Sequence, residues 1–203
     1  MQGKTKEKII TLNNLEDLWL DCKKHWENTW LPDRDFFQDK TCVDIGMWKG
    51  LLNARAKKEF NLATNIGVEP DEMHRLACKK LNLSTTLYAN IEDLPDMIKT
   101  DIVLLHGVFS VMGKHWRQEL ENLFSKINCK HVHIRLNGYS SRHIRPTGTG
   151  RQTSRYALTS YKDTATSDMV IDFLSKKGFD LLEQKTLSEK YIILKLQKKI
   201  YEN

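Results

Sequence analysis

Residues 41–70 read TCVDIGMWKGLLNARAKKEFNLATNIGVEP, and this stretch decides the fold. Residues 41–46 are mostly apolar or β-branched and end at a glycine, which predicts a strand followed by a tight turn. Apolar side chains then recur at helical spacing over residues 48–60. A second apolar run over residues 63–69 predicts another strand, which Pro70 stops. The stretch therefore predicts a strand–helix–strand unit whose strands are parallel.

The same alternation continues along the rest of the chain. Further strands are predicted at residues 85–89, 101–105, 131–136, 179–186 and 190–197, and further helices at residues 15–28, 73–81, 116–127 and 169–174. The last two strands are joined by a link too short for a parallel crossover, so we expect them to pair antiparallel. The chain is therefore predicted to be a doubly wound α/β protein, with a mostly parallel seven-stranded sheet and a C-terminal antiparallel hairpin.

Length and composition favour one domain over residues 1–203. We expect an N-terminal helical cap at residues 1–38, an α/β core at 40–198 and a loop at 137–165. With 40% hydrophobic and 29% charged residues, the composition excludes a disordered tail and a membrane protein. We expect a cytoplasmic protein without a signal peptide, whose four widely spaced cysteines are reduced thiols.

In a doubly wound sheet, ligands bind at the carboxyl ends of the strands. Asp44 ends the first strand and favours an amine or cation over a phosphate, although this segment could also be an ordinary tight turn. Glu69 ends the second strand, where a carboxylate can accept hydrogen bonds from both hydroxyls of a ribose; it could instead be a solvated acid that caps the next helix. Asn90 and Ile91 follow the third strand and offer an amide and an apolar face to a purine, or form a simple turn.

The order of these segments resembles the class I S-adenosylmethionine-dependent methyltransferases. The resemblance covers about residues 40–198 and rests on Asp44-x-Gly46-x-x-x-Gly50, Gly67-Val-Glu69-Pro, Asn90-Ile-Glu-Asp-Leu-Pro, Asp101-Ile-Val-Leu-Leu-His106 and the closing Phe173-Leu-x-x-x-Gly178-Phe-Asp-Leu-Leu with Tyr191-Ile-Ile-Leu. It implies a Rossmann-like methyltransferase fold and S-adenosylmethionine as cofactor. The cofactor-binding residues it implies are Asp44, Gly46, Met47, Gly50, Glu69, Pro70, Asn90 and Ile91.

Trp48 departs from the family pattern, which has a glycine or small residue in this part of the loop. Its indole could close the cofactor channel, or it could pack in the apolar stripe of the following helix with Leu51 and Leu52. Helical periodicity favours the stripe.

The acceptor side is expected after the fourth and fifth strands. His106 is the candidate catalytic base, because an imidazole there could deprotonate a hydroxyl or an amine; it could also simply bond a loop. Phe109 is a candidate substrate contact, since His106-Gly-Val-Phe109 is similar to the acceptor motif of adenine amino-methyltransferases without its two prolines. Alternation puts His131, His133 and Arg135 on one face of the fifth strand, under a helix or lining a cavity, and we expect no metal site.

The positive charge gathers in the second half of the chain. Residues 137–165 contain five Lys or Arg and one Asp, in a loop that follows the fifth strand. Long loops in compact domains are usually functional or disordered. Tyr139, Arg142 and Arg145 are the candidate substrate-binding residues in this loop, because arginine side chains hold phosphate and carboxylate groups. The alternative is a solvated loop.

The sequence thus predicts a methyltransferase that transfers a methyl group to an O or N atom of a small anionic acceptor. A nucleic-acid methyltransferase is one alternative, and a non-catalytic binding or scaffold module with a degenerate cofactor site is another. A nucleotide-dependent oxidoreductase is disfavoured, because Asp44 would repel a pyrophosphate. No membrane partner is expected, and the sequence does not indicate an oligomeric state.

Overall fold

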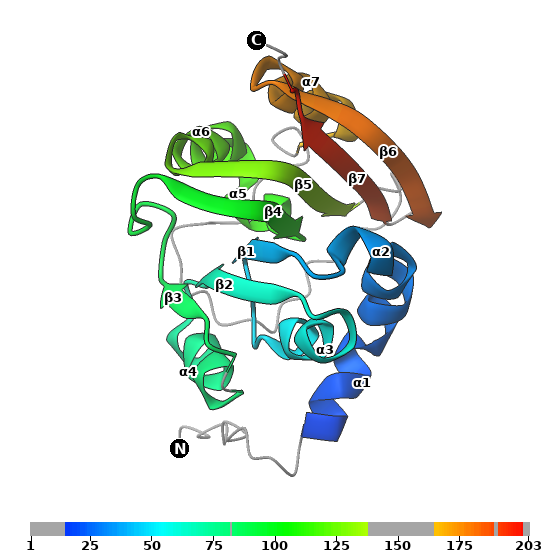
Figure 1. Cartoon of the computed structure of the whole chain (residues 1–203), viewed down its shortest axis with the longest axis vertical. Helices are drawn as coiled ribbons and strands as arrows, with labels where there is room; N and C mark the ends of the chain where they lie inside the picture. Colours follow the sequence, from blue (N-terminus) through cyan, green and yellow to red (C-terminus); the bar gives the residue numbers. More distant parts are fainter. Residues whose placement is uncertain (1–14, 82, 138–164, 189–190, 201–203) are drawn as a thin grey trace, which may run out of the picture.

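The computed structural model describes residues 15–81, 83–137, 165–188 and 191–200. The described residues form a seven-stranded sheet in the order β3-β2-β1-β4-β5-β7-β6 (Figure 1). The strands are β1 Thr41–Ile45, β2 Ala63–Val68, β3 Thr86–Tyr88, β4 Ile98–His106, β5 Ile127–Asn137, β6 Phe179–Ser188 and β7 Tyr191–Lys198. Strands β1 to β5 are parallel, whereas β7 pairs antiparallel with both β5 and β6. The predicted α/β fold with its C-terminal antiparallel hairpin is confirmed.

Helices cover both faces of the sheet. The elements are α1 Leu15–His25, the π-helical turn η2 Trp26–Trp30, the 3₁₀ turn η3 Leu31–Asp33, α2 Arg34–Phe37, α3 Leu51–Phe60, α4 Glu72–Lys80, α5 Phe109–Met112, the 3₁₀ turn η4 Gly113–His115, α6 Trp116–Lys126 and α7 Ser167–Lys176. Helices α5, α6 and α7 bury their apolar side chains with Val43, Val103 and Val132 on one face. The segment from α1 to α2, called the cap below, and α3 pack on Cys42 and Ile102 on the opposite face. We call this second face the cap face.

The period of two along each strand sorts the side chains between these faces. Because Val132 and Ile134 of β5 point to the α6 face, His131, His133 and Arg135 point to the cap face. The predicted polar face of β5 is therefore confirmed, and it lies under the cap.

Several predicted boundaries differ from the structure, and the largest differences at the start of an element are those of β4, β5 and α3. Strand β4 begins at Ile98, and β5 begins at Ile127 directly after α6, so both strands are longer than their purely apolar runs. Helix α3 begins at Leu51 and not at Trp48, because Trp48 and Gly50 have left-handed φ angles of 51° and 71° that no α-helix contains.

No helix among the described residues combines the length and the apolar character needed to cross a bilayer. The four cysteines are buried and none forms a disulfide.

Aromatic side chains attach the cap to the sheet. Trp26 and Trp30 are each 1% exposed, and the Trp26 ring stacks on Phe60 of α3 with 4.9 Å between ring centroids. Phe37 is fully buried, and its ring centroid lies 5.1 Å from that of Trp30. The cap is thus part of the core.

We expect Trp26→Ala to lower the free energy of unfolding by about 3–5 kcal/mol, as other large-to-small core substitutions do. The matched control is Leu20→Ala in α1, whose side chain is 67% exposed, and it should change stability by no more than about 0.5 kcal/mol. Urea unfolding of both variants measures the difference, and equal effects would show that the cap is not anchored by its tryptophans.

Candidate functional site

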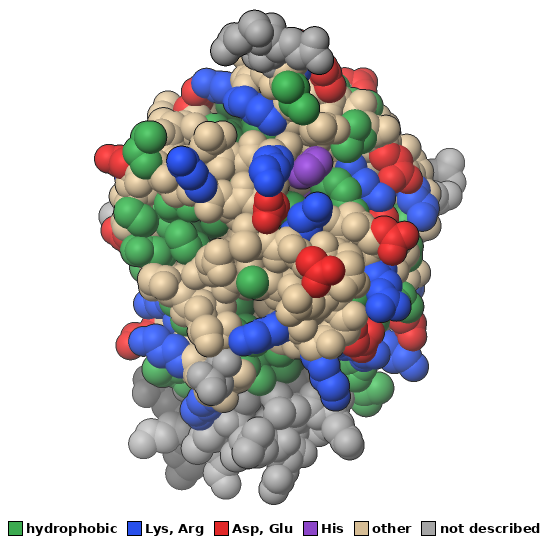
Figure 2. All heavy atoms as spheres, in the orientation of Figure 1, with side chains coloured by type: hydrophobic (Ala, Val, Ile, Leu, Met, Phe, Trp, Pro, Cys, Tyr) green, Lys and Arg blue, Asp and Glu red, His purple; other side chains and the backbone are tan. Residues whose placement is uncertain are grey.

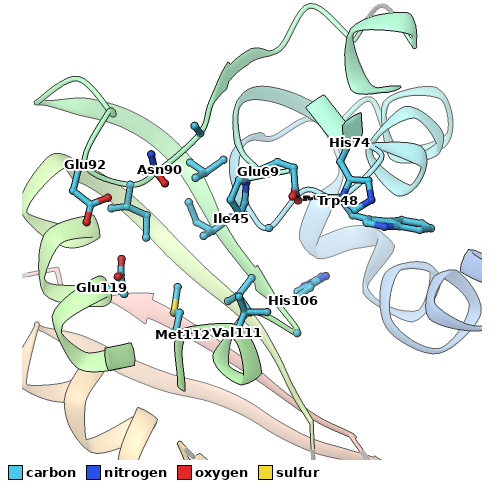
Figure 3. Close-up of a pocket in the computed structure, with 17 residues that line it drawn as sticks. Ile45, Trp48, Glu69, His74, Asn90, Glu92, His106, Val111, Met112 and Glu119 are labelled. Atoms are coloured by element: carbon cyan, nitrogen blue, oxygen red, sulfur yellow. Dashed lines mark hydrogen bonds and ion pairs between the residues drawn. The ribbon is translucent and has the colours of Figure 1, made fainter. Parts of the chain in front are cut away.

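Two adjoining cavities lie where the strand order reverses between β1 and β4. The first has a volume of about 330 Å³ and is lined by strand-end residues that include Glu69, Pro70, Asn90 and Ile91 (Figure 3). The second has a volume of about 370 Å³ and lies on the cap face, where its lining residues are Cys22, His25, Trp30, Asp44, Gly46, Met47, Trp48, Leu51, Leu52, Asn53, His106 and Arg135. Gly46, Trp48 and His106 line both cavities. Most of the predicted cofactor residues are thus brought together, but they are divided between two connected spaces.

Glu69 is held rigidly at the first cavity. It follows β2 and is 6% exposed. Its Oε2 accepts a hydrogen bond from the backbone N–H of Trp48 at 2.8 Å, and its Oε1 accepts one from the N–H of Asp71 at 3.0 Å. The N-cap of α4 is Asp71, which accepts from the N–H of His74. Glu69 is therefore a buried carboxylate at the cavity wall and not the solvated helix cap that the sequence left open.

Asp44 is the acid of the second cavity. It points to the cap face of β1, is 5% exposed, and accepts a hydrogen bond from Nδ2 of Asn53 at 2.8 Å. Burial raises the pKa of Asp44 to about 7; the hydrogen bond from Asn53 opposes this effect, and the negative charge of Glu69 adds to it. The carboxyl group is thus costly to ionise unless a cation lies beside it.

Gly46 allows the chain to turn between the two cavities. Its φ is +76°, and a Cβ atom there would lie 2.4 Å from Cγ1 of Val108. A larger residue would strain the turn and displace the start of α5.

The expectation that Trp48 packs in the apolar stripe of α3 is wrong. Its positive φ turns the side chain out of the helix, and the indole lies edge-on to His74, with 5.9 Å between ring centroids (Figure 3). Nζ of Lys49 lies 4.6 Å from the centre of the Trp48 ring. Trp48 lines the first cavity but leaves it open.

The other predicted site residues are placed as follows. Met47 lines the second cavity, whereas Gly50 caps α3 and lines neither cavity. Phe109 is 3% exposed and packs against Trp116 in the core. Its predicted contact with substrate is therefore replaced by a packing role. Tyr139, Arg142 and Arg145 lie outside the described residues.

His106 belongs to a chain of polar side chains on the cap face. Nε2 of His106 lies 2.7 Å from Nδ1 of His133, and Nε2 of His133 lies 2.8 Å from Oδ2 of Asp33 in the cap. Oδ1 of Asp33 is 2.5 Å from Nζ of Lys195 on β7. The sequence indicated His106 and the polar face of β5. It gave no signal for Asp33 and Lys195, which are distant in the chain.

Burial and neighbouring charges keep the histidines neutral. Desolvation lowers the pKa of His133 despite the carboxylate of Asp33. Desolvation and the charge of Arg135 lower the pKa of His106 well below its usual value, and a proton on His133 or His25 would lower it further. The pKa of His25 falls to about 3 through burial and the charges of Arg135 and His133. Burial acts to raise the pKa of Asp33, but hydrogen bonds from His133 and Lys195 outweigh it and lower this pKa.

No protein-family model and no curated protein sequence matches this chain. Solved structures do match it. An O-methyltransferase family protein from Burkholderia thailandensis superposes with a TM-score of 0.66 at 12% identity over 93% of this chain, which spans only 59% of that protein. The magnesium protoporphyrin IX methyltransferase of Synechocystis with bound SAM gives 0.59 at 13% identity, covering 98% of this chain and 87% of the other.

A tRNA methyltransferase of B. subtilis also matches, with a TM-score of 0.57 at 12% identity over 95% of this chain and 68% of the other. These neighbours act on acceptors as different as a porphyrin and a tRNA, so the shared feature is the architecture of the sheet and the strand ends. The chain therefore has the fold of the class I S-adenosylmethionine-dependent methyltransferases, which the order of its sequence motifs predicts.

Proposed function

We propose that the chain is an S-adenosylmethionine-dependent methyltransferase. The observation that carries the proposal is the buried carboxylate of Glu69, which two backbone N–H groups hold at the wall of the first cavity. An acid at the end of the second strand is the group that accepts hydrogen bonds from ribose hydroxyls in nucleotide-binding sheets. When bound, the cofactor would supply an electrophilic methyl group on a sulfonium.

The residues of the first cavity suit an adenosine. Glu69 would accept hydrogen bonds from the ribose. Ile91 is 5% exposed and offers an apolar face for the adenine ring. Nδ2 of Asn90 donates to Oδ2 of Asp93 at 3.0 Å, which leaves the carbonyl oxygen of Asn90 for the amino group of the purine.

Asp44 suits the amino group of the methionine part. A primary ammonium placed beside it would stabilise the ionised carboxylate and offset its desolvation. Gly46 lets the backbone come close to the same group. Two buried acids fit a cationic cofactor better than a dinucleotide, whose pyrophosphate they would repel.

The second cavity supports a small anionic acceptor. The guanidinium of Arg135 lines it and stacks 3.9 Å above the ring of Tyr191, where it can hold a carboxylate or phosphate. On the face seen in Figure 2, the basic side chains are interspersed with acidic ones and do not form a continuous stripe.

S-adenosylhomocysteine should raise the melting temperature of the wild-type protein, because it binds only the folded state. Glu69→Gln keeps the shape of the side chain but replaces the carboxylate, whose charged oxygens would accept the ribose hydrogen bonds, with a neutral amide. The affinity for S-adenosylhomocysteine should therefore fall at least about tenfold. Glu72→Gln, an exposed acid in the next helix, is the matched control and should bind like wild type. The measurements are thermal shift and calorimetry, and an unshifted wild type would overturn the cofactor proposal.

Asp44→Asn should stabilise the free protein at alkaline pH. The pKa of Asp44 is about 7 in the folded wild-type protein and about 3.9 in the unfolded chain. Between these pH values the native state binds more protons than the unfolded state, so the free energy of unfolding falls as the pH rises. The variant lacks this loss and should exceed wild type at pH 8 by at most about 4 kcal/mol.

The histidine contributions are common to Asp44→Asn and wild type and cancel in the difference between them. Asp96→Asn, whose side chain is 82% exposed, is the control and should show no such difference. The Asp44 variant should also bind S-adenosylhomocysteine more weakly. If the Asp44 variant were more stable but bound S-adenosylhomocysteine as tightly as wild type, Asp44 would affect stability without contacting the cofactor.

A nucleic-acid acceptor would show a different dependence of binding on salt concentration. Each phosphate contact would make the logarithm of affinity fall with the logarithm of salt concentration by about 0.7 to 0.9. We expect short single-stranded RNA and DNA to show no such dependence in fluorescence anisotropy between low and physiological salt. A steep slope that flattens in an Arg142→Ala/Arg145→Ala variant would identify nucleic acid as the acceptor.

A further inference from the structure

The chain Asp33–His133–His106 fixes where protons sit on the two imidazoles. Asp33 is ionised between His133 and Lys195, so its oxygens only accept hydrogen bonds. His133 must therefore donate from Nε2. Burial lowers the pKa of His133 and so favours its neutral form, in which Nδ1 carries a lone pair and accepts the hydrogen bond from Nε2 of His106. His106 is in turn neutral, which leaves its Nδ1 without a proton.

His106, which carries this free nitrogen, lines both the first and the second cavity. Nδ1 of His106 is buried and has no hydrogen-bond partner within the part of the chain that the structure describes. The same is true, among those residues, of Nε2 of His25 and Nε1 of Trp30. All three residues line the second cavity. Buried polar atoms in native proteins are nearly always paired with protein groups, water or a ligand, and these three nitrogens belong to residues at one cavity where a ligand could pair with them.

Four of the residues that line this cavity carry aromatic rings, namely His25, Trp30, Trp48 and His106. The ring of His106 lies 5.4 Å from that of His25 and 5.3 Å from that of Trp30, in tilted and edge-on arrangements. Rings in these arrangements present faces and edges to a flat guest. Arg135 adds a cation at the same cavity.

We propose that Asp33 and His133 hold His106 with its proton on Nε2, so that Nδ1 takes the proton of a planar aromatic acid whose hydroxyl or N–H group receives the methyl. The proposal rests on the methyltransferase function proposed above and specifies its acceptor. His106 is the catalytic residue, whereas Asp33 and His133 are positioning residues.

The step balances. The proton of the acceptor hydroxyl or N–H passes to Nδ1 of His106 as the lone pair of that oxygen or nitrogen attacks the methyl carbon. The carbon–sulfur bond breaks, and its electron pair stays on sulfur, which becomes a neutral thioether. His106 is then an imidazolium whose charge the carboxylate of Asp33 stabilises through His133. Bulk water later takes the proton.

Several charged groups surround the hydrogen-bonded series Asp33–His133–His106 and influence where its protons lie. Lys195 and Glu183 flank Asp33 from β7 and β6, with 2.6 Å between Nζ of Lys195 and Oε2 of Glu183. His25 of the cap and Arg135 of β5 face His106, and both act against its protonation. A resting His106 is therefore neutral, and the carboxylate of Asp33, acting through His133, is the group that stabilises a proton on it once the acceptor supplies one.

The tautomer can be read directly by ¹⁵N NMR of protein labelled at histidine, with His106→Gln used to assign the signals. We expect a pyridine-like shift for Nδ1 of His106 and a pyrrole-like shift for Nε2 in the wild type. Asp33→Asn should mix the two tautomers, because an amide can donate as well as accept. Asp35→Asn, an exposed neighbour in α2, is the matched control and should leave the shifts unchanged.

A wild-type Nδ1 with a pyrrole-like shift would overturn the inference, and this deciding shift is measured on the wild-type protein. Because it needs no cofactor, it is also independent of the methyltransferase proposal. If S-adenosylhomocysteine fails to bind, that proposal falls. If it binds and Nδ1 carries the proton, the present inference alone is wrong.

The acceptor class is tested with a matched pair of probes, 3-hydroxy-2-naphthoate and 3-methoxy-2-naphthoate, in the presence of S-adenosylhomocysteine. Both carry the ring and the carboxylate, but only the first has a hydroxyl to donate. We expect the hydroxyl probe to bind at least tenfold more tightly and to shift the Nδ1 signal of His106. Equal binding of the two probes, or an unmoved Nδ1 signal, would overturn the assignment.

Discussion

The carboxylate of Asp33 joins three parts of the molecule that are far apart in the chain. It lies in the cap, yet it contacts His133 of β5 and Lys195 of β7 at 2.8 Å and 2.5 Å. Burying such a charge is costly unless partners satisfy it, and removing one partner of a buried pair costs more than the pair contributes. The contact therefore specifies how the cap lies on the sheet. The position of the cap in turn sets the walls of the second cavity and the orientation of His106.

A second constraint is the pair of buried acids. Asp44 and Glu69 are both almost fully covered, and the charge of Glu69 makes ionisation of Asp44 harder. A fold selected for stability alone would have little use for either acid. Perturbed buried acids of this kind cluster at functional sites, and both lie at adjoining strand ends beside the two cavities. The Asp33–His133–His106 chain differs from these acids in that its members satisfy one another and leave only the terminal nitrogen free.

How far the sequence predicts this site depends on how local each signal is. Glu69, Asp44 and Gly46 follow from strand ends that can be located by their own residues. The polar face with His133 follows from alternation along one strand. Asp33 does not follow, because 100 residues separate it from His133 and no periodicity links them. Helical spacing wrongly assigns Trp48 to the apolar stripe of α3, because residue spacing cannot reveal a positive φ angle that delays the start of the helix.

The π-helical turn Trp26–Trp30 has a consequence for how the cap could vary. Its closing hydrogen bond, from the N–H of Leu31 to the oxygen of Trp26, spans one residue more than an α-helical bond. Deleting a single residue within the turn would let an ordinary α-helix form and would rotate everything before it by about 100° relative to Asp33. Cys22 and His25 would then leave the second cavity, while the anchor at Asp33 would remain. The length of this one turn is therefore a simple means by which insertion or deletion could remodel the walls of the second cavity without altering the sheet.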